Sequence, residues 1–338
     1  MKMRRKLGIK LLMVVVGLLL ILPLSVAGCA TTEKQPIVFG DLSWDSAQVH
    51  DRIAGLILEH GYGYEWECIP GDTAAIWLGM RHGDVDVNME SWTENILDIY
   101  TPAIESGDVV DLGTNYPDSG QGWLVPTYMI EGDPERGIEA VAPDLKTIDD
   151  LPKYWELFKD PEVPSKGRFH NSIPGWKCTE INSLKLQAYG LDEYYNDFIT
   201  GSDAALSGSM FAAYEKGEPW LGYYWEPTWV LGMMDMTYVE EPSFDQAEWD
   251  AETYGCAFPP TQVNVIVNSA LLDRAPDVVE FLKSYETTAA QNNKVLAYMR
   301  ENEADTMGGA LYFLEEFESV WTKWVSSDVA SKVKAALA

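Results

Sequence analysis

The segment from residue 37 to residue 105 reads IVFGDLSWDSAQVHDRIAGLILEHGYGYEWECIPGDTAAIWLGMRHGDVDVNMESWTENILDIYTPAIE. Short runs rich in β-branched and aromatic residues predict three strands, at 37–42, 64–69 and 85–89. Apolar residues at helical spacing predict three helices, at 47–60, 73–81 and 93–105. Asp72 is a suitable N-cap for the second helix. This alternating order predicts a mostly parallel sheet covered by helices, which is an α/β fold.

A second α/β unit follows a Pro- and Gly-rich region near residue 124. Its predicted strands are 167–173, 220–225 and 264–267, and its predicted helices are 151–158, 179–189, 210–216 and 276–287, with closing helices in 311–337. We therefore expect two lobes joined by two crossings, near 122–130 and 252–262, which would close like a clamshell on a ligand. The alternative is a single compact α/β enzyme.

The expected boundaries place residues 37–125 and 252–338 in lobe 1 and residues 126–251 in lobe 2. Ahead of them, the first ten residues carry five Lys or Arg and no acid, and an apolar run covers 11–22. That run is too short to span a bilayer and ends in Val-Ala-Gly-Cys at 26–29, as in a lipoprotein signal peptide. We expect residues 1–28 to be removed, Cys29 to carry the lipid anchor on the outer face of the cell membrane, and 29–36 to be a tether.

The chain is strongly acidic, with a formal net charge of −29. This charge argues against nucleic acid as a partner, because phosphates would be repelled. It is compatible with a cationic or zwitterionic ligand, or simply with solubility. Besides Cys29 there are three widely spaced cysteines, Cys68, Cys178 and Cys256, in no metal-binding spacing. We expect at most one disulfide, no metal and no cofactor.

Four of the 13 tryptophans lie at the carboxyl ends of predicted strands: Trp44, Trp92 and Trp176 follow a strand, and Trp225 ends one. Ligands of open α/β sheets sit beyond the carboxyl ends of strands, so these side chains are expected to form one cleft wall. Trp123, at the first crossing, is a fifth candidate. Indole faces attract a quaternary ammonium group by roughly 0.5–2 kcal/mol each. They also stack on sugars, so composition alone leaves both ligand classes open. We assign to core packing Trp66, Trp77, Trp155, Trp249, Trp321 and Trp324.

Four segments together resemble glycine betaine-binding proteins of osmoprotectant ABC importers. Residues 39–46 (FGDLSWDS) and 90–93 (ESWT) are similar to the two aromatic segments of that family's first lobe. Residues 174–178 (PGWKC) resemble its PGWxC turn, and residues 223–229 (YYWEPTW) resemble its WxPxW segment. Order and spacing match over nearly the whole chain beyond the signal peptide.

The resemblance implies a type II periplasmic-binding fold and an aromatic cage drawn from Trp92, Trp176 and Trp225, with Trp44 joining. It also implies that backbone N–H groups of Gly175 and Trp176 hold the ligand carboxylate, at a turn that precedes a helix. Asn95 is a further candidate. The implied partners are an ABC permease and its ATPase, and the implied ligand is glycine betaine, with choline, carnitine or proline betaine as alternatives.

Two departures separate this sequence from the family pattern. The second Cys that many relatives carry before the PGW turn is missing from 169–172 (FHNS), so the local disulfide is absent. Where several relatives place a carboxylate-binding His five residues after the first-lobe Trp, this chain has Leu97. Glu90 and Glu94 flank Trp92 instead. They are either solvated or suited to a ligand with less negative charge, such as choline.

Two other classes of protein fit the sequence less well. An enzyme is disfavoured because the sequence contains no GxSxG, HExxH or P-loop motif, and none of the four His lies in a nucleophile motif. A carbohydrate-binding lipoprotein with a Trp-lined cleft is the main alternative, and it would need polar side chains arranged beside the indoles.

Overall fold

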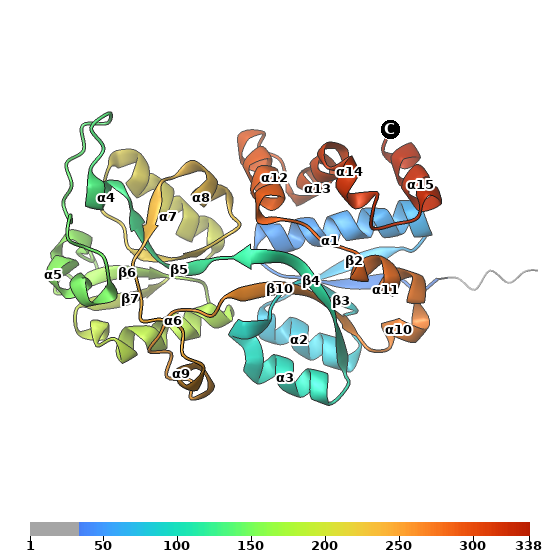
Figure 1. The fold of residues 1–338 in the computed structure, drawn as a ribbon, viewed down its shortest axis with the longest axis horizontal. Helices are drawn as coiled ribbons and strands as arrows, with labels where there is room; N and C mark the ends of the chain where they lie inside the picture. Colours follow the sequence, from blue (N-terminus) through green and yellow to red (C-terminus); the bar gives the residue numbers. More distant parts are fainter. Residues whose placement is uncertain (1–33) are drawn as a thin grey trace, which may run out of the picture. The chain divides into compact units, whose positions relative to one another are not determined.

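Two five-stranded sheets organise residues 34–338, the part of the chain that the computed structural model describes (Figure 1). The first sheet has the order β2-β1-β3-β10-β4, from β1 (Ile37–Asp41), β2 (Trp66–Pro70), β3 (Val87–Trp92), β4 (Val109–Ser119) and β10 (Thr261–Asn268). The second has the order β7-β6-β8-β5-β9, from β5 (Gln121–Pro126), β6 (Gly167–Asn171), β7 (Tyr195–Ile199), β8 (Gly222–Trp225) and β9 (Met236–Tyr238). Both sheets are mixed: the first three strands in each order are parallel, and the last two pair antiparallel.

Helices cover both faces of the first sheet, as Figure 1 shows. One face carries α1 (Asp45–Ile57), α12 (Ala289–Glu301), α13 (Thr306–Glu316), α14 (Glu318–Trp321) and α15 (Ser327–Leu337). On the other side lie α2 (Thr73–His82) and α3 (Leu97–Glu105), and α10 (Leu271–Arg274) and α11 (Pro276–Lys283) follow β10. Ile53, Val267 and Phe313 are fully buried between α1, the sheet and α13, where the apolar side of each element meets the others.

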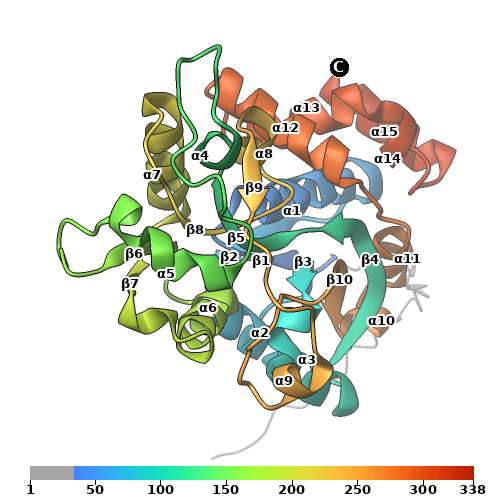
Figure 2. The same cartoon turned by 60° about the vertical axis from the view of Figure 1, so that its left-hand side comes forward.

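The second sheet is covered in the same way, which Figure 2 shows from the side of this lobe. Its helices are α4 (Tyr128–Glu131), α5 (Leu151–Tyr154), α6 (Lys177–Ala188), α7 (Asp203–Lys216) and α8 (Trp229–Met233), and α9 (Gln246–Asp250) lies on the return segment. Trp123, Phe169 and Leu206 are fully buried around it. The architecture is therefore two α/β lobes, as predicted.

Two segments connect the lobes. β4 leads into β5 through Gly120, and the chain returns through α9 to β10. The lobe boundary expected between residues 125 and 126 falls near the end of β5, a strand that pairs wholly within the second sheet. The second sheet thus begins at Gln121.

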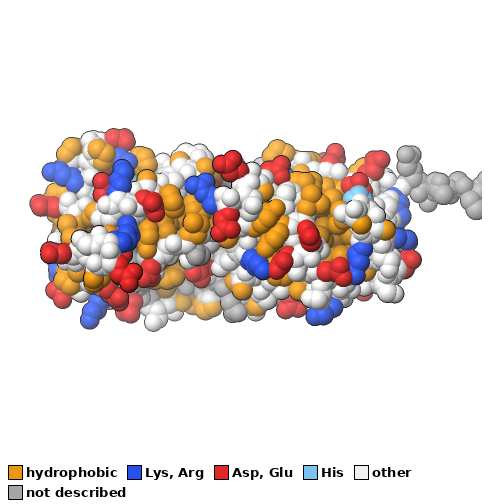
Figure 3. Space-filling model, turned by 90° about the horizontal axis from the view of Figure 1, so that it is seen from above, with side chains coloured by type: hydrophobic (Ala, Val, Ile, Leu, Met, Phe, Trp, Pro, Cys, Tyr) orange, Lys and Arg blue, Asp and Glu red, His pale blue; other side chains and the backbone are white. Residues whose placement is uncertain are grey.

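Acidic side chains are scattered among basic and apolar ones over the face drawn in Figure 3. This distribution favours solubility as the role of the acidic charge there, because no single acidic patch forms. Within residues 34–338, no helix is both long and apolar enough to cross a membrane. The predicted signal peptide, Cys29 and the tether up to residue 33 lie outside the described residues.

Candidate ligand-binding site

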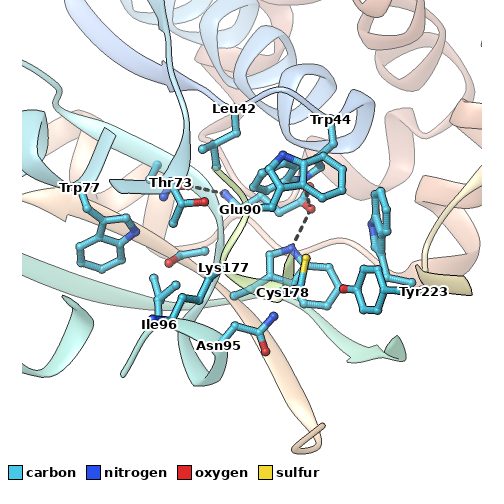
Figure 4. Close-up of a pocket in the computed structure, with 15 residues that line it drawn as sticks. Leu42, Trp44, Thr73, Trp77, Glu90, Asn95, Ile96, Lys177, Cys178 and Tyr223 are labelled. Atoms are coloured by element: carbon cyan, nitrogen blue, oxygen red, sulfur yellow. Dashed lines mark hydrogen bonds between the residues drawn. The ribbon is translucent and has the colours of Figure 1, made fainter. Parts of the chain in front are cut away.

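A pocket lies where the two lobes meet (Figure 4). The first lobe lines it with Leu42, Trp44, Thr73, Trp77, Asn88, Glu90, Ser91, Trp92, Asn95 and Ile96, and the second with Trp176, Lys177, Cys178, Tyr223 and Trp225. The four tryptophans that follow or end predicted strands are all in this wall. The structure therefore brings them together in one pocket, and their contact with a ligand stays a prediction.

Three of the indoles form adjoining walls at right angles. The ring of Trp176 lies 5.3 Å from that of Trp44, at 82°, and 4.9 Å from that of Trp225, at 84°. All three side chains are at least nine-tenths buried. Edge-to-face packing of this kind is stabilising and holds each ring in a fixed orientation. The pocket thus presents rigid aromatic surfaces from both lobes.

A buried carboxylate accepts hydrogen bonds from two of the indoles. Glu90 is 1% exposed, and its Oε1 accepts hydrogen bonds from Trp44 Nε1 at 2.6 Å and Trp92 Nε1 at 3.1 Å. Ser46 Oγ donates to the same oxygen at 3.1 Å. Burial raises the pKa of the Glu90 carboxyl, and these hydrogen bonds oppose the shift. When ionised, Glu90 therefore both orients the rings and places a negative charge beside them.

Local backbone conformation explains the positions of Trp44 and Trp176. Each is the residue just before a helix and has extended backbone, Trp44 before α1 and Trp176 before α6. Gly175 has φ +93°, and a Cβ there would lie 2.7 Å from the Cβ of Asp72. Glycine is therefore required for the turn to approach the first lobe closely. Trp176 Nε1 also donates to Ser43 Oγ at 2.8 Å, which ties the two lobes together.

The first turn of α6 faces the pocket through Lys177 and Cys178. Lys177 Nζ pairs with Asp98 of the first lobe at 3.1 Å. The Trp176 N–H donates to the carbonyl of Ile173 at 3.3 Å, so this N–H already has a partner within the turn. Gly175 shapes the turn but is not part of the pocket wall.

The cysteines within residues 34–338 are unpaired. Burial raises the pKa of the Cys178 thiol to about 11, so it is a neutral group in the pocket wall. The missing local disulfide inferred from the sequence agrees with this state.

The other expected site residues have different surroundings. Asn95 lines the pocket and exchanges two hydrogen bonds of 3.0 Å with the side-chain amide of Gln121, at the start of β5. Trp123 is instead fully buried in the second lobe, where its Nε1 donates to Asn182 Oδ1 at 2.8 Å. β5 pairs between β8 and β9, and the Trp123 ring packs on Phe169 and Tyr189 inside the lobe.

Two further aromatic residues line the pocket although the sequence did not predict them there. Trp77 was assigned to the core, and it is 1% exposed, but it also lines the pocket from α2. Its helical spacing gave no sign of that second role. Tyr223 precedes Trp225 by two residues on β8, so strand alternation places both on one face and could have identified it. Its hydroxyl donates to Gln121 Oε1 at 2.8 Å.

Comparison with known proteins gives the family. Residues 35–316 match the family described as the substrate binding domain of ABC-type glycine betaine transport system, OpuAC. The trimethylamine N-oxide-binding protein of Pelagibacter ubique is 23% identical over 295 residues, which cover 87% of this chain and 91% of the relative.

Solved structures have the same fold. The glycine betaine, L-proline-binding protein ProX from Borrelia burgdorferi gives a TM-score of 0.72 at 18% identity, covering 89% of this chain and 100% of the other. An ABC-transporter choline-binding protein in complex with choline gives a TM-score of 0.72 at 17% identity, covering 90% and 98%. The prediction of a two-lobed type II periplasmic-binding fold is thereby confirmed.

Proposed function

We propose that this chain, which belongs to the family of substrate-binding domains of ABC-type glycine betaine transport systems, captures a quaternary-amine solute in its aromatic pocket for import. The family consists of solute-binding proteins, not enzymes, and acts outside the cytoplasm. In this proposal the chain delivers its ligand to an ABC permease driven by an ATPase.

The observation that carries the proposal is the set of indoles with an acid behind them. A trimethylammonium group cannot donate N–H hydrogen bonds, so hydrogen-bonding side chains contribute little to its binding. Aromatic faces and a nearby carboxylate attract it strongly in a water-poor site. Trp44, Trp92, Trp176 and Trp225 supply the faces, and Glu90 supplies the charge.

The remainder of the ligand would lie toward the second lobe. A carboxylate, as in glycine betaine, would be held by N–H groups at the first turn of α6, where the helix dipole favours an anion. The Trp176 N–H would join them by exchanging its bond to the Ile173 carbonyl for one to the ligand. Glycine betaine remains our first choice. Choline, carnitine, proline betaine and trimethylamine N-oxide share its methylated nitrogen.

Calorimetric titration with these five compounds tests the proposal. We expect binding of at least one at micromolar affinity or tighter, and far weaker binding of its neutral isostere, in which carbon replaces nitrogen. Comparable binding of the isostere would refute cation recognition. Binding of a sugar with no response to the methylated amines would favour a carbohydrate-binding function instead.

The membrane anchor is a separate part of the proposal and rests on the sequence at 26–29 (VAGC). We propose that Cys29 carries the lipid. Cys29→Ser should release the protein from the membrane fraction or leave it uncleaved, while ligand affinity stays unchanged. Incorporation of labelled fatty acid into the variant would contradict this assignment.

A further inference from the structure

Three potential metal ligands converge beside the carboxyl end of β1 in the first lobe, outside the wall of the aromatic pocket. Asp41 ends β1, Asp51 lies on α1, and Cys68 lies on β2 beside β1. One ligand atom from each, two carboxylate oxygens and the sulfur, lie within 4.8 Å of one another. None of the three lines the ligand pocket.

Asp51 brings a buried carboxyl group without a hydrogen-bond partner to the cluster. It is 1% exposed, and among residues 34–338 neither of its carboxylate oxygens has a hydrogen-bond partner. A buried carboxylate without hydrogen bonds is strongly unfavourable in its charged form, so native proteins neutralise such groups, pair them or use them to bind metals. Both oxygens of Asp51 are therefore available to an ion.

The charges at the cluster favour a divalent cation. Arg52 donates from Nη1 to Asp41 Oδ1 at 2.6 Å and from Nη2 to Asp41 Oδ2 at 3.3 Å. Its Nη1 is 4.0 Å from Cys68 Sγ. With Cys68 as a thiolate, three anionic groups face one guanidinium, and a doubly charged ion would balance the remainder. A carboxylate has enough lone pairs to accept hydrogen bonds from Arg52 and also bind a metal ion. Arg52 would therefore orient Asp41 without contacting the ion itself.

We propose that Asp41, Asp51 and Cys68 form a binding site for a divalent metal ion of the zinc class. One thiolate and two carboxylates suit zinc, whereas calcium and magnesium prefer oxygen ligands alone. Binding would transfer the thiol proton of Cys68 to solvent, and water would complete the coordination. Such an ion would tie the end of β1 to α1 and β2, three residues before Trp44 of the aromatic pocket.

This site could not be predicted from the sequence because its three residues follow no metal-binding spacing. They come together only through the parallel pairing of β1 with β2 and the packing of α1.

Cobalt absorption spectroscopy on the full-length, reduced, metal-free protein tests the site. We expect one equivalent of Co²⁺ to give thiolate-to-metal charge transfer, and Zn²⁺ to displace it. Cys68→Ser should abolish the charge-transfer band, and Asp51→Asn should weaken metal binding by about tenfold or more. Cys256→Ser is the matched control, a buried thiol elsewhere in the chain, and should bind metal like the unmodified protein.

Ligand titration separates loss of the site from loss of the fold. Each variant should still bind the methylated amine that the unmodified protein binds, and each should keep its near-UV circular dichroism. Absence of metal binding by the unmodified protein would overturn the proposal, and so would a charge-transfer band that persists in Cys68→Ser. Equal metal affinity in folded Asp51→Asn would overturn it as well. These readouts do not depend on the identity of the transported solute.

Discussion

At the scale of single residues, Glu90 distinguishes this pocket from a purely aromatic one. Glu90→Gln keeps a side-chain oxygen for the Trp44 and Trp92 indoles but removes the charge. We expect affinity for a quaternary amine to fall about tenfold, equivalent to about 1.4 kcal/mol, measured by calorimetry. The matched control is Glu94→Gln, which removes an equal charge nearby but outside the pocket wall. If the two variants bind the amine equally well, the charge of Glu90 does not contribute to ligand binding.

The pKa of Glu90 leads us to expect a pH dependence of the affinity for the ligand. Burial raises the pKa of Glu90, so the carboxyl takes up a proton at a higher pH than a solvated glutamate does. Its negative charge is present above that raised pKa and is lost as the pH falls through it. Affinity for the cation should therefore decrease on acidification in the unmodified protein and change less in Glu90→Gln.

The tryptophans give a second residue-scale prediction. Trp92→Ala, Trp176→Ala and Trp225→Ala each remove a cation–π surface and buried apolar area, so we expect a loss of about 1–3 kcal/mol of binding free energy. Substitution by Phe or Tyr should cost less because an aromatic face remains. Fluorescence or calorimetric titration measures both effects.

Trp321 supplies the control for those variants. It is 1% exposed in the first-lobe core, and its Nε1 donates to the Leu314 carbonyl at 2.8 Å. Trp321→Ala should lower stability but leave affinity near normal in the folded protein. Normal binding by all three pocket variants would refute the aromatic cage.

At the scale of helices and strands, the sequence predicted the alternating first lobe well. Each of the first three strands and the helices after them was found close to its expected bounds, because most of these runs end near a Gly, Pro or Asp. β4 (Val109–Ser119) was missed. It contains Gly, Asn, Asp and Pro, which disfavour strands, and its pairing with β10 compensates for them.

The candidate site was predictable to the same degree. The four tryptophans could be grouped because each ends or follows a strand, and the carboxyl ends of parallel strands share one edge of a sheet. Trp77 could not, because its role depends on how α2 packs beside the pocket. Trp123 was expected in the cleft only because it lies at the first crossing. Its actual position inside the second lobe follows from the pairing of β5 with β8.

The cap of α2 gives an element-scale prediction. As expected from the sequence, Asp72 accepts a hydrogen bond through Oδ1 from the Ala75 N–H at 2.9 Å. Asp72→Ala should lower the free energy of unfolding by about 1 kcal/mol, whereas Asp72→Asn retains the cap and should lower it less. Urea denaturation measures both variants. Equal stability of the two would mean that the cap contributes nothing.

At the scale of the whole molecule, the lobes make contacts that we expect to form on closure. Besides the bond from Trp176 to Ser43 and the ion pair of Lys177 with Asp98, Trp249 Nε1 donates to the Glu94 carbonyl at 2.9 Å. Because pocket walls come from both lobes, a ligand should favour the closed form. Small-angle scattering should give a smaller radius of gyration with saturating ligand. An unchanged radius, with binding verified separately, would contradict the clamshell.

The strand order of the first sheet has a consequence for biosynthesis. β10 (Thr261–Asn268) lies between β3 and β4, although more than 100 residues separate it from either in the chain. All strands of the second sheet emerge from the ribosome or the export channel before β10 does. The second lobe can therefore acquire its structure early, while β3 keeps an open edge that is prone to aggregation. Protection of that edge by chaperones during export would matter most in the interval before residue 261 appears.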